Sequence, residues 1–395
     1  MQNRQNKIYE LKERIIKIIK EYDDQGIHRT GTNVDNNSAQ WLANEIEKLG
    51  LKPKLEGFQF KNIEIDEASL EINNNKIDGL PLYDSTLPGE EIIKGKLGTL
   101  KEEYKIGISR VNNETIRRYN KLRRSNKHLG LIFITEGRTP GLSLINAEFF
   151  QESFGPPTLQ ISSEYWSWIT SNIGKEAILT FKIKKVDSEA FNIVTRLNCE
   201  YNNLNPMVIM TPRSGWWNCA SERAGGIAIF LEIMRDFCIN KLKRDVIFLA
   251  TSGHELGHLG LFHYLKRNPS LLEFASCWLH LGANLAASPQ RDNNNRVIPT
   301  IMIQSSNSEI ESLSLKVLKN SKITPKLSIP GERRPWGEVK NIFEGGGQYF
   351  SIIDTYNQYF HHPDDKWPSA VNINKTVEIA NALITISTQL TNLKK

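Results

Sequence analysis

The sequence predicts an α/β protein with a central mixed, mostly parallel sheet, helices on both faces of that sheet, and an inserted, mostly β lobe. Two features of the 395-residue chain lead to this prediction. In its second half, short apolar runs typical of buried strands alternate with helical stretches, the pattern of a sheet covered on both faces. In its middle, strand-like stretches follow one another with a single convincing helix. A chain of this length can bury one large core or two moderate ones.

Residues 1–67 are assigned to the main domain. Apolar residues recur at helical spacing from Ile8 to Tyr22, with charges between them, which predicts an amphipathic helix. A second helix is expected to follow "NNSAQ" and to end near Gly50, whose permissive backbone suits a helix terminus. The stretch "EGFQF" then predicts a strand.

Residues 68–187 are expected to form a separate, mostly β lobe. Short strand-like stretches are separated here by Gly, Pro and Asn. The expected strands are "ASLEI", "YKIGIS", "LGLIFIT", "PTLQIS" and "AILTFKI". The expected helix covers residues 113–124.

Residues 188–395 return to the main domain and carry the α/β pattern. The runs "FNIVTRL", "PMVIMT", "DVIFLAT" and "SCWLHLGA" predict buried strands. Between and after them, "ERAGGIAIFLEIMRDF" and "VNINKTVEIANALITISTQL" predict helices. This alternation is what places a parallel or mixed sheet at the centre of the predicted fold.

Composition limits the classes of partner. The net charge is +6, but 50 Lys and Arg are mixed with 44 Asp and Glu and form no basic stripe, so we expect no nucleic-acid partner. No run reaches about 18 apolar residues and the N-terminus is highly charged, so we expect a soluble, cytoplasmic protein with no membrane partner. The four cysteines form no C-x-x-C pair, which indicates small core residues rather than disulfides or a thiolate zinc cluster. Oligomeric state is not predicted.

The segment "TSGHELGHLGLFH", residues 251–263, contains an H-E-x-x-H motif. On a helix, this spacing would place two imidazoles on one face, able to share a zinc ion, with the glutamate as general base. Here the apolar run Val246–Ala250 comes shortly before His254, so the motif falls where a strand ends and a helix begins. His263 follows His258 by five residues, one fewer than the metzincin pattern requires. We therefore expect the H-E-x-x-H spelling to be incidental.

Polar residues gather at four predicted strand ends. These ends read "MTPRSGWWNCASERAGGIA", "TSGHELGHLG", "WLHLGAN" and "YFHHPDDKWPSAV", and six of the eight histidines lie between residues 254 and 362. Open α/β sheets carry their chemistry outside the carboxyl ends of their strands. The sequence therefore predicts a functional site at this edge of the sheet.

This series of segments resembles the zinc aminopeptidase and glutamate carboxypeptidase family, peptidase family M28, an α/β fold whose members typically bind two zinc ions. In that family a strand ends in H-x-D, a D-x-x-S-G segment opens the next helix, and a Glu-Glu pair follows a later strand. A lone Asp ends another strand, and Y-H-T-P-x-D closes the site. The similarity runs from "GIHRTGT" to the last helix. The lobe of residues 68–187 resembles the protease-associated domain that many members carry as an insertion.

The resemblance implies that one of the two metal sites is lost. The family's first histidine falls on Pro212 and its partner aspartate on Ser214. The lone aspartate falls on Gly282. Proline and glycine offer no side-chain ligand, and a serine hydroxyl does not supply the charge of the carboxylate that it replaces.

The resemblance also implies that the ligands of the other metal persist. The bridging aspartate falls on Glu222, the metal-binding member of the Glu-Glu pair on Glu255, and the closing histidine on His361. Pro363 and Asp365 keep the expected offsets after that histidine. Two oxygens, one imidazole nitrogen and an open fourth position suit a catalytic zinc ion, so one zinc ion per chain is expected. Manganese or cobalt is an alternative for such a donor set.

Two more histidines receive predicted roles from the resemblance. The family's general base falls on His254, which is expected to act as a base if it stays neutral near pH 7, with a fourth metal ligand as the alternative. His280 lies two residues before Gly282 on the same strand face. For His280 we weigh a further metal ligand against a buried, hydrogen-bonded histidine.

The remaining site predictions concern groups around the metal. Asp365 is expected to orient the closing loop or the ligand histidine. Arg213, Trp216 and Trp217 lie beside a strand end and suit contacts with a substrate side chain or carboxylate. Packing between the two lobes is the alternative for these three residues.

Three functions remain open from the sequence. The first is a metal-dependent hydrolase of peptide or amide bonds acting on a small peptide or amide substrate, with His254 as the substituted general base. The second is a catalytically inactive member of the same family that acts as a binding protein. The third is an acyltransferase resembling glutaminyl cyclases, which also keep one zinc ion in this fold.

Overall fold

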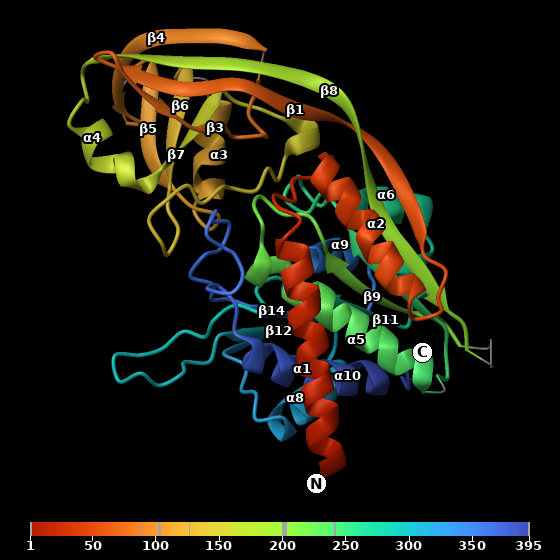
Figure 1. Cartoon of the computed structure of the whole chain (residues 1–395). Helices are drawn as coiled ribbons and strands as arrows, with labels where there is room; N and C mark the ends of the chain where they lie inside the picture. Colours follow the sequence, from red (N-terminus) through yellow and green to blue (C-terminus); the bar gives the residue numbers. More distant parts are fainter. Residues whose placement is uncertain are drawn as a thin grey trace.

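The main lobe is built around the parallel strands that the apolar runs predicted (Figure 1). The computed structural model describes residues 2–87, 89–101, 104–125, 127–199, 204–240 and 242–393. The strands of this lobe are β9 (Met207–Pro212), β10 (Val246–Thr251), β11 (Cys277–Leu281), β12 (Ile301–Ser305), β13 (Leu327–Ile329) and β14 (Tyr349–Asp354). Strands β10, β9, β11 and β14 are parallel neighbours, whereas β12 is antiparallel to β14. The predicted mixed, mostly parallel sheet is confirmed.

Helices cover both faces of this sheet, as predicted. One face carries α1 (Gln2–Asp23), α2 (Asn33–Glu47), α5 (Gly225–Ile239), α8 (Ser308–Asn320) and α10 (Ile373–Leu390). The other face carries α6 (Leu259–Arg267), α7 (Leu271–Phe274) and α9 (Val339–Glu344). Alternate residues of β9 serve the two cores, because strand side chains point to opposite faces: Met207 and Ile209 join the first core, Val208 and Met210 the second.

A long antiparallel ribbon links the main lobe to the β lobe. It consists of β1 (Lys54–Ile72) and β8 (Glu176–Leu197), which pair from Lys54 opposite Val194 to Glu71 opposite Ile178. β8 also pairs with β10, so the ribbon continues the main sheet. The expected strands "EGFQF" and "ASLEI" are both parts of β1, and "AILTFKI" and "FNIVTRL" are both parts of β8. The boundaries predicted at residues 67 and 187 therefore lie inside continuous strands.

The inserted lobe is mostly β, in the order of elements that the sequence indicated. Its strands are β2 (Asn75–Asp78), β3 (Leu80–Pro81), β4 (Glu90–Thr99), β5 (Ile106–Val111), β6 (Gly130–Thr135) and β7 (Thr158–Ser162). Its helices are α3 (Ile116–Arg124), within the range expected for a helix, and the short α4 (Trp166–Thr170). The sheet path runs β13-β12-β14-β11-β9-β10-β8-β4-β5-β6-β7-β3, through both lobes.

Two expectations about the whole chain can be compared with the structure. No helix in the part of the chain that the structure describes is long and apolar enough to cross a membrane. Cys219 and Cys277 are buried, as expected for small core residues. Cys238 is exposed, because it lies near the end of α5 where that helix reaches the surface, so its assignment to the core was wrong.

The connection between α1 and α2 is anchored by a buried histidine. His28 is fully buried, its ring is stacked 3.7 Å from the ring of Tyr22, and its Nδ1 lies 3.1 Å from the carbonyl oxygen of Asn218. Burial, assisted by the positive charge of Arg213, lowers the pKa of His28 to about 3. This contact fixes the N-terminal segment against the loop that leads into the candidate site.

We expect His28 to make folding stability depend on pH. Its usual pKa is near 6.5, so below that pH the unfolded chain binds a proton that the folded chain excludes, and stability falls as the pH drops toward 3. At about pH 5, this linkage destabilises the folded state by about 2 kcal/mol relative to neutral pH. In His28→Asn, the difference in urea-unfolding free energy between neutral pH and about pH 5 should shrink by about that amount. An unchanged difference would show that His28 is accessible to protons in the folded state.

Candidate functional site

The candidate site lies where the sequence placed it, at the carboxyl ends of the parallel strands. β9 ends at Pro212 and β10 at Thr251, and the segments that follow bring Ser214 and Glu255 together. The H-E-x-x-H motif is not helical: residues 254–257 form turns, and His258, with a φ of 64°, is the residue before α6. The two histidines therefore do not have the relative placement of a zinc-protease helix, in agreement with the sequence analysis.

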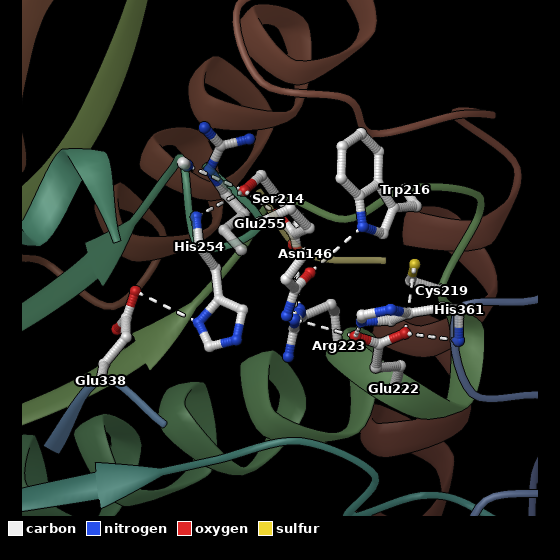
Figure 2. A network of polar contacts seen from close by, with 12 residues as sticks. Asn146, Ser214, Trp216, Cys219, Glu222, Arg223, His254, Glu255, Glu338 and His361 are labelled. Atoms are coloured by element: carbon white, nitrogen blue, oxygen red, sulfur yellow. Dashed lines mark hydrogen bonds and ion pairs between the residues drawn. The ribbon is translucent and has the colours of Figure 1, made fainter. Parts of the chain in front are cut away.

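An arginine occupies the centre of this site (Figure 2). Arg223 Nη2 lies 2.8 Å from Oε1 of Glu222 and 2.7 Å from Oε1 of Glu255. Arg223 Nε also donates to the carbonyl oxygen of Ser214 at 2.9 Å. All three charged side chains are buried. One guanidinium thus forms ion pairs with both of the carboxylates that the resemblance had assigned to a metal ion.

The turn that carries Arg223 explains how it reaches both carboxylates. Residues Ala220–Ala224 form a π-helical turn before α5, entered through Cys219 in the left-handed conformation. The backbone N–H groups of Ser221 and Glu222 donate to the two carboxylate oxygens of Asp365, at 2.8 and 3.0 Å. Asp365 was predicted to orient the loop or the closing histidine, whereas its contacts hold the turn that carries Glu222.

Each charge in the site is shifted by burial and by its neighbours. Burial opposes ionisation of Glu222, but Arg223 and His361 outweigh it and hold the pKa of Glu222 at about 2. Burial raises the pKa of Glu255, although Arg223 partly offsets that rise. Burial and the nearby Glu222 raise the pKa of Asp365 to about 7, despite the backbone donors of the turn. The site therefore retains a firm ion pair between Arg223 and Glu222.

Glu255 is also held by Ser214, on which the resemblance placed the partner aspartate of the family's first histidine. The Ser214 hydroxyl donates to Oε2 of Glu255 at 2.9 Å and accepts a hydrogen bond from the backbone N–H of Gly253 at 2.9 Å. Both oxygens of Glu255 therefore already accept from protein donors. Ser214 does not replace the family's aspartate as a metal-site group, but positions Glu255.

His361 reaches the site through a strained backbone and a contact with the β lobe. Its φ is 57°, and its Nδ1 lies 2.6 Å from the carbonyl oxygen of Leu144 and 3.1 Å from the side-chain nitrogen of Asn113. Its Nε2 lies 3.3 Å from Oε1 of Glu222. This nitrogen is buried and has no hydrogen-bond partner.

His254 lies beside a carboxylate that sequence reasoning missed. Its Nδ1 lies 3.4 Å from Oε1 of Glu338, as Figure 2 shows, and its ring is stacked on that of His258 at 4.9 Å. Glu338 is buried and accepts from the Thr251 hydroxyl at 3.0 Å. Burial, together with Arg223, lowers the pKa of His254 well below its usual value. His254 is therefore neutral near pH 7.

His280 lies in β11 and is buried. Its Nδ1 is 2.8 Å from the Ser351 hydroxyl, and burial lowers its pKa to about 4. Its Nε2 is buried without a hydrogen-bond partner. A Cβ placed at Gly282 or Gly337 would come within 3.2 or 3.3 Å of the ring, so two glycines provide space beside this imidazole. The placement matches the buried, hydrogen-bonded alternative weighed for His280.

The predicted substrate-binding role of Arg213 was wrong. Its side chain is completely buried and forms an ion pair of 2.8 Å with Asp35 in α2. It also donates to the carbonyl oxygens of Asp35 and Phe191, which leaves it no path to the cleft. The sequence showed a cation beside a strand end, but not the acidic partner contributed by a distant helix.

Removal of this ion pair tests its structural role. In Arg213→Met, Asp35 loses its cationic partner in the core, so we expect a loss of about 3–5 kcal/mol in unfolding free energy, measured by urea titration. The double variant Arg213→Met/Asp35→Leu removes both charges and should recover part of that loss. A loss below about 1 kcal/mol in the single variant would contradict the assignment.

The two predicted tryptophans take different positions. Trp216 lines a pocket of about 270 Å³ together with Glu255, and its indole N–H donates to Asn146 of the β lobe at 3.1 Å. Trp217 donates to the carbonyl oxygen of His361 at 2.8 Å. Trp216, which is 2% exposed, therefore forms part of the wall of this pocket, whereas Trp217 supports the loop that carries His361.

The predicted ligands Glu222, Glu255 and His361 do not have the spacing that a zinc ion requires. Zinc lies about 2.0–2.2 Å from its oxygen and nitrogen ligands, so the ligand atoms must come close together. Among the described residues, the only three His, Cys, Asp or Glu side chains whose ligand atoms all lie within 4.8 Å of one another are Cys219, Glu222 and Asp365. Glu255 and His361 are outside this group, and Arg223 stands between Glu222 and Glu255. The predicted set does not fit a zinc ion in this arrangement.

Two residues of the site were assigned no role from the sequence. Arg223 stands directly before the apolar run Ala224–Phe230, and a charge at the start of a buried helix needs a buried counter-charge. That signal could have identified Arg223 as the partner of Glu222. Glu338 lies in "RPWGEVKN", outside every predicted strand end, and nothing in its local sequence marks it.

Comparison with solved structures shows that the chain has the fold of the zinc aminopeptidases. It is similar to a zinc aminopeptidase from Bacillus subtilis, with a TM-score of 0.78 and 16% identity over 96% of this chain and 94% of that one. A Peptidase M28 precursor from Shewanella amazonensis gives a TM-score of 0.74 and 14% identity over 99% and 97% of the two chains. An aminopeptidase from Aneurinibacillus gives 0.72 and 13% over 96% and 93%.

Comparison of sequences gives no match at the level of families. No protein-family model matches the chain, and no curated protein sequence matches it. The similarity therefore lies in the fold across nearly the full length of each compared protein. The chemistry of this chain has to be inferred from its own residues.

Proposed function

We propose that this chain is a binding protein built on the zinc aminopeptidase fold, in which an arginine has taken the place of the metal charge. The observation that carries the proposal is the position of Arg223, within 2.8 Å of carboxylate oxygens of both Glu222 and Glu255. A guanidinium pairs with these carboxylates but neither activates water as a Lewis acid nor offers an exchangeable ligand position. The loss of ligand side chains at Pro212 and Gly282 agrees with this proposal.

The general-base position supports the same conclusion. His254 points to Glu338 and stacks on His258, whereas a base would have to reach a water molecule between the carboxylates. In this chain, the guanidinium of Arg223 lies between the two carboxylates. A small molecule would instead be held in the adjoining pocket, lined by Trp216 and Glu255.

A second candidate is the single-zinc hydrolase of peptide or amide bonds expected from the sequence. The buried, unpartnered Nε2 of His361, 3.3 Å from Glu222, is the observation that favours it. Glu222, Glu255 and His361 would be the ligands, and Arg223 would first have to leave the two carboxylates. The acyltransferase alternative has the same requirement.

Metal content separates these two candidates. Wild-type protein, supplied with zinc and then passed through a desalting column, is expected to retain only substoichiometric zinc by mass spectrometry. Arg223→Ser removes the guanidinium and should gain zinc, together with a rise in melting temperature on zinc addition that the wild type does not show. Arg235→Ser removes an arginine from the outer part of α5 and serves as the matched control.

Either of two results would overturn the binding-protein proposal. The first is one tightly bound zinc ion per wild-type chain, lost in both Glu255→Ala and His361→Ala. The second is release of amine by the wild type from a panel of aminoacyl amides and dipeptides. We expect neither, because both carboxylates are already paired with a cation that cannot exchange.

A further inference from the structure

The residues that line the pocket beside Glu255 indicate which class of ligand suits it. It has a volume of about 270 Å³ and is lined by the N-terminal loop, by β1 and by loops of both lobes. Its apolar lining comes from residues such as Ile63, Leu80 and Leu256, and its aromatic lining from Tyr83 and Trp216. Such walls suit the apolar body of a small ligand.

One cation in this pocket has no acidic partner. Arg29 lines the pocket, its Nε donates to the carbonyl oxygen of Trp216 at 3.1 Å, and its guanidinium carbon lies 4.9 Å above the ring of Trp217. No carboxylate of the described residues forms an ion pair with Arg29, whereas the buried Arg213 and Arg223 each have acidic partners. A positioned guanidinium with spare N–H donors is a recognition group for carboxylate or phosphate.

The carboxylate in the same pocket is not the partner of Arg29. Both oxygens of Glu255 already accept hydrogen bonds, one from the Ser214 hydroxyl and one from Arg223. Glu255 is therefore held by these two donors, and the spare N–H groups of Arg29 remain for a ligand. Arg29 is the group in this pocket that favours an anion.

We propose that this pocket binds a small monocarboxylic acid with an apolar body, whose carboxylate pairs with Arg29 while the body packs against Tyr83 and Trp216. This inference rests on the proposed binding function and adds the class of ligand. The volume of the pocket is below the roughly 300–1,000 Å³ typical of sites for drug-sized ligands. A ligand of the size of one N-acylated amino acid fits this limit.

The carboxylate is the group to vary in the test. N-acetyl-L-leucine, L-leucine and L-leucinamide are titrated into the full chain by calorimetry; they carry, in turn, only the carboxylate, both charged groups, and only the ammonium. We expect N-acetyl-L-leucine to bind the wild type, and L-leucinamide to bind about tenfold to 100-fold more weakly. Arg29→Gln should lose this preference for the carboxylate, and Arg29→Lys should restore part of it.

A control variant outside the pocket shows whether any loss of binding is specific to Arg29. Arg138→Gln alters an exposed arginine that stacks 4.7 Å from the ring of Tyr356, outside the pocket, and should bind as the wild type does. Equal or tighter binding of L-leucinamide, no binding of any probe, or an unchanged carboxylate preference in Arg29→Gln would each overturn the assignment of Arg29. Zinc content, measured on the same preparation, reports separately on the binding-protein proposal.

Discussion

The ion triad of Glu222, Arg223 and Glu255 is the constraint on which the candidate site depends. Two carboxylates buried close to one another cannot both remain charged without a cation, because the protein interior solvates them poorly. In a zinc enzyme that cation is the metal ion. Here the chain supplies it from its own sequence, one residue after Glu222, on a π-helical turn held by Asp365. The single positive charge of Arg223 is therefore shared by the two carboxylates.

The two lobes jointly set the geometry around this triad. The β lobe holds His361 through Leu144, holds Trp216 through Asn146, and donates the backbone N–H of Ala147 to the carbonyl oxygen of Glu255 at 2.8 Å. Three contacts from one short segment of the inserted lobe thus position residues from three separate loops of the main lobe. The inserted lobe acts as part of the site's framework as well as one wall of its pocket.

The strands and the edge of the sheet that carries the site could be predicted from the sequence, because neighbouring residues along the chain determine them. Apolar runs of about six residues marked β9 and β10, and polar segments at their ends marked the edge of the sheet where the site lies. The partners of individual side chains could not be predicted in this way. Arg213 pairs with Asp35 and His254 with Glu338, across sequence separations that no local pattern records. The resemblance pointed to Glu222 and Glu255, but could not show that Arg223 would pair with both of them.

The ribbon of β1 and β8 has a mechanical consequence. Because β8 is paired with β10 in the main sheet and with β4 in the β lobe, the same backbone ladder belongs to both lobes. The cleft cannot open by rotation about a flexible linker, as in proteins whose domains are joined by loops; it can open only if two paired strands bend or twist together. Excision of the inserted lobe at residues 67 and 187 would truncate both strands and remove more than half of the pairs of the ribbon, so the insertion has become inseparable from the ribbon that continues the main sheet.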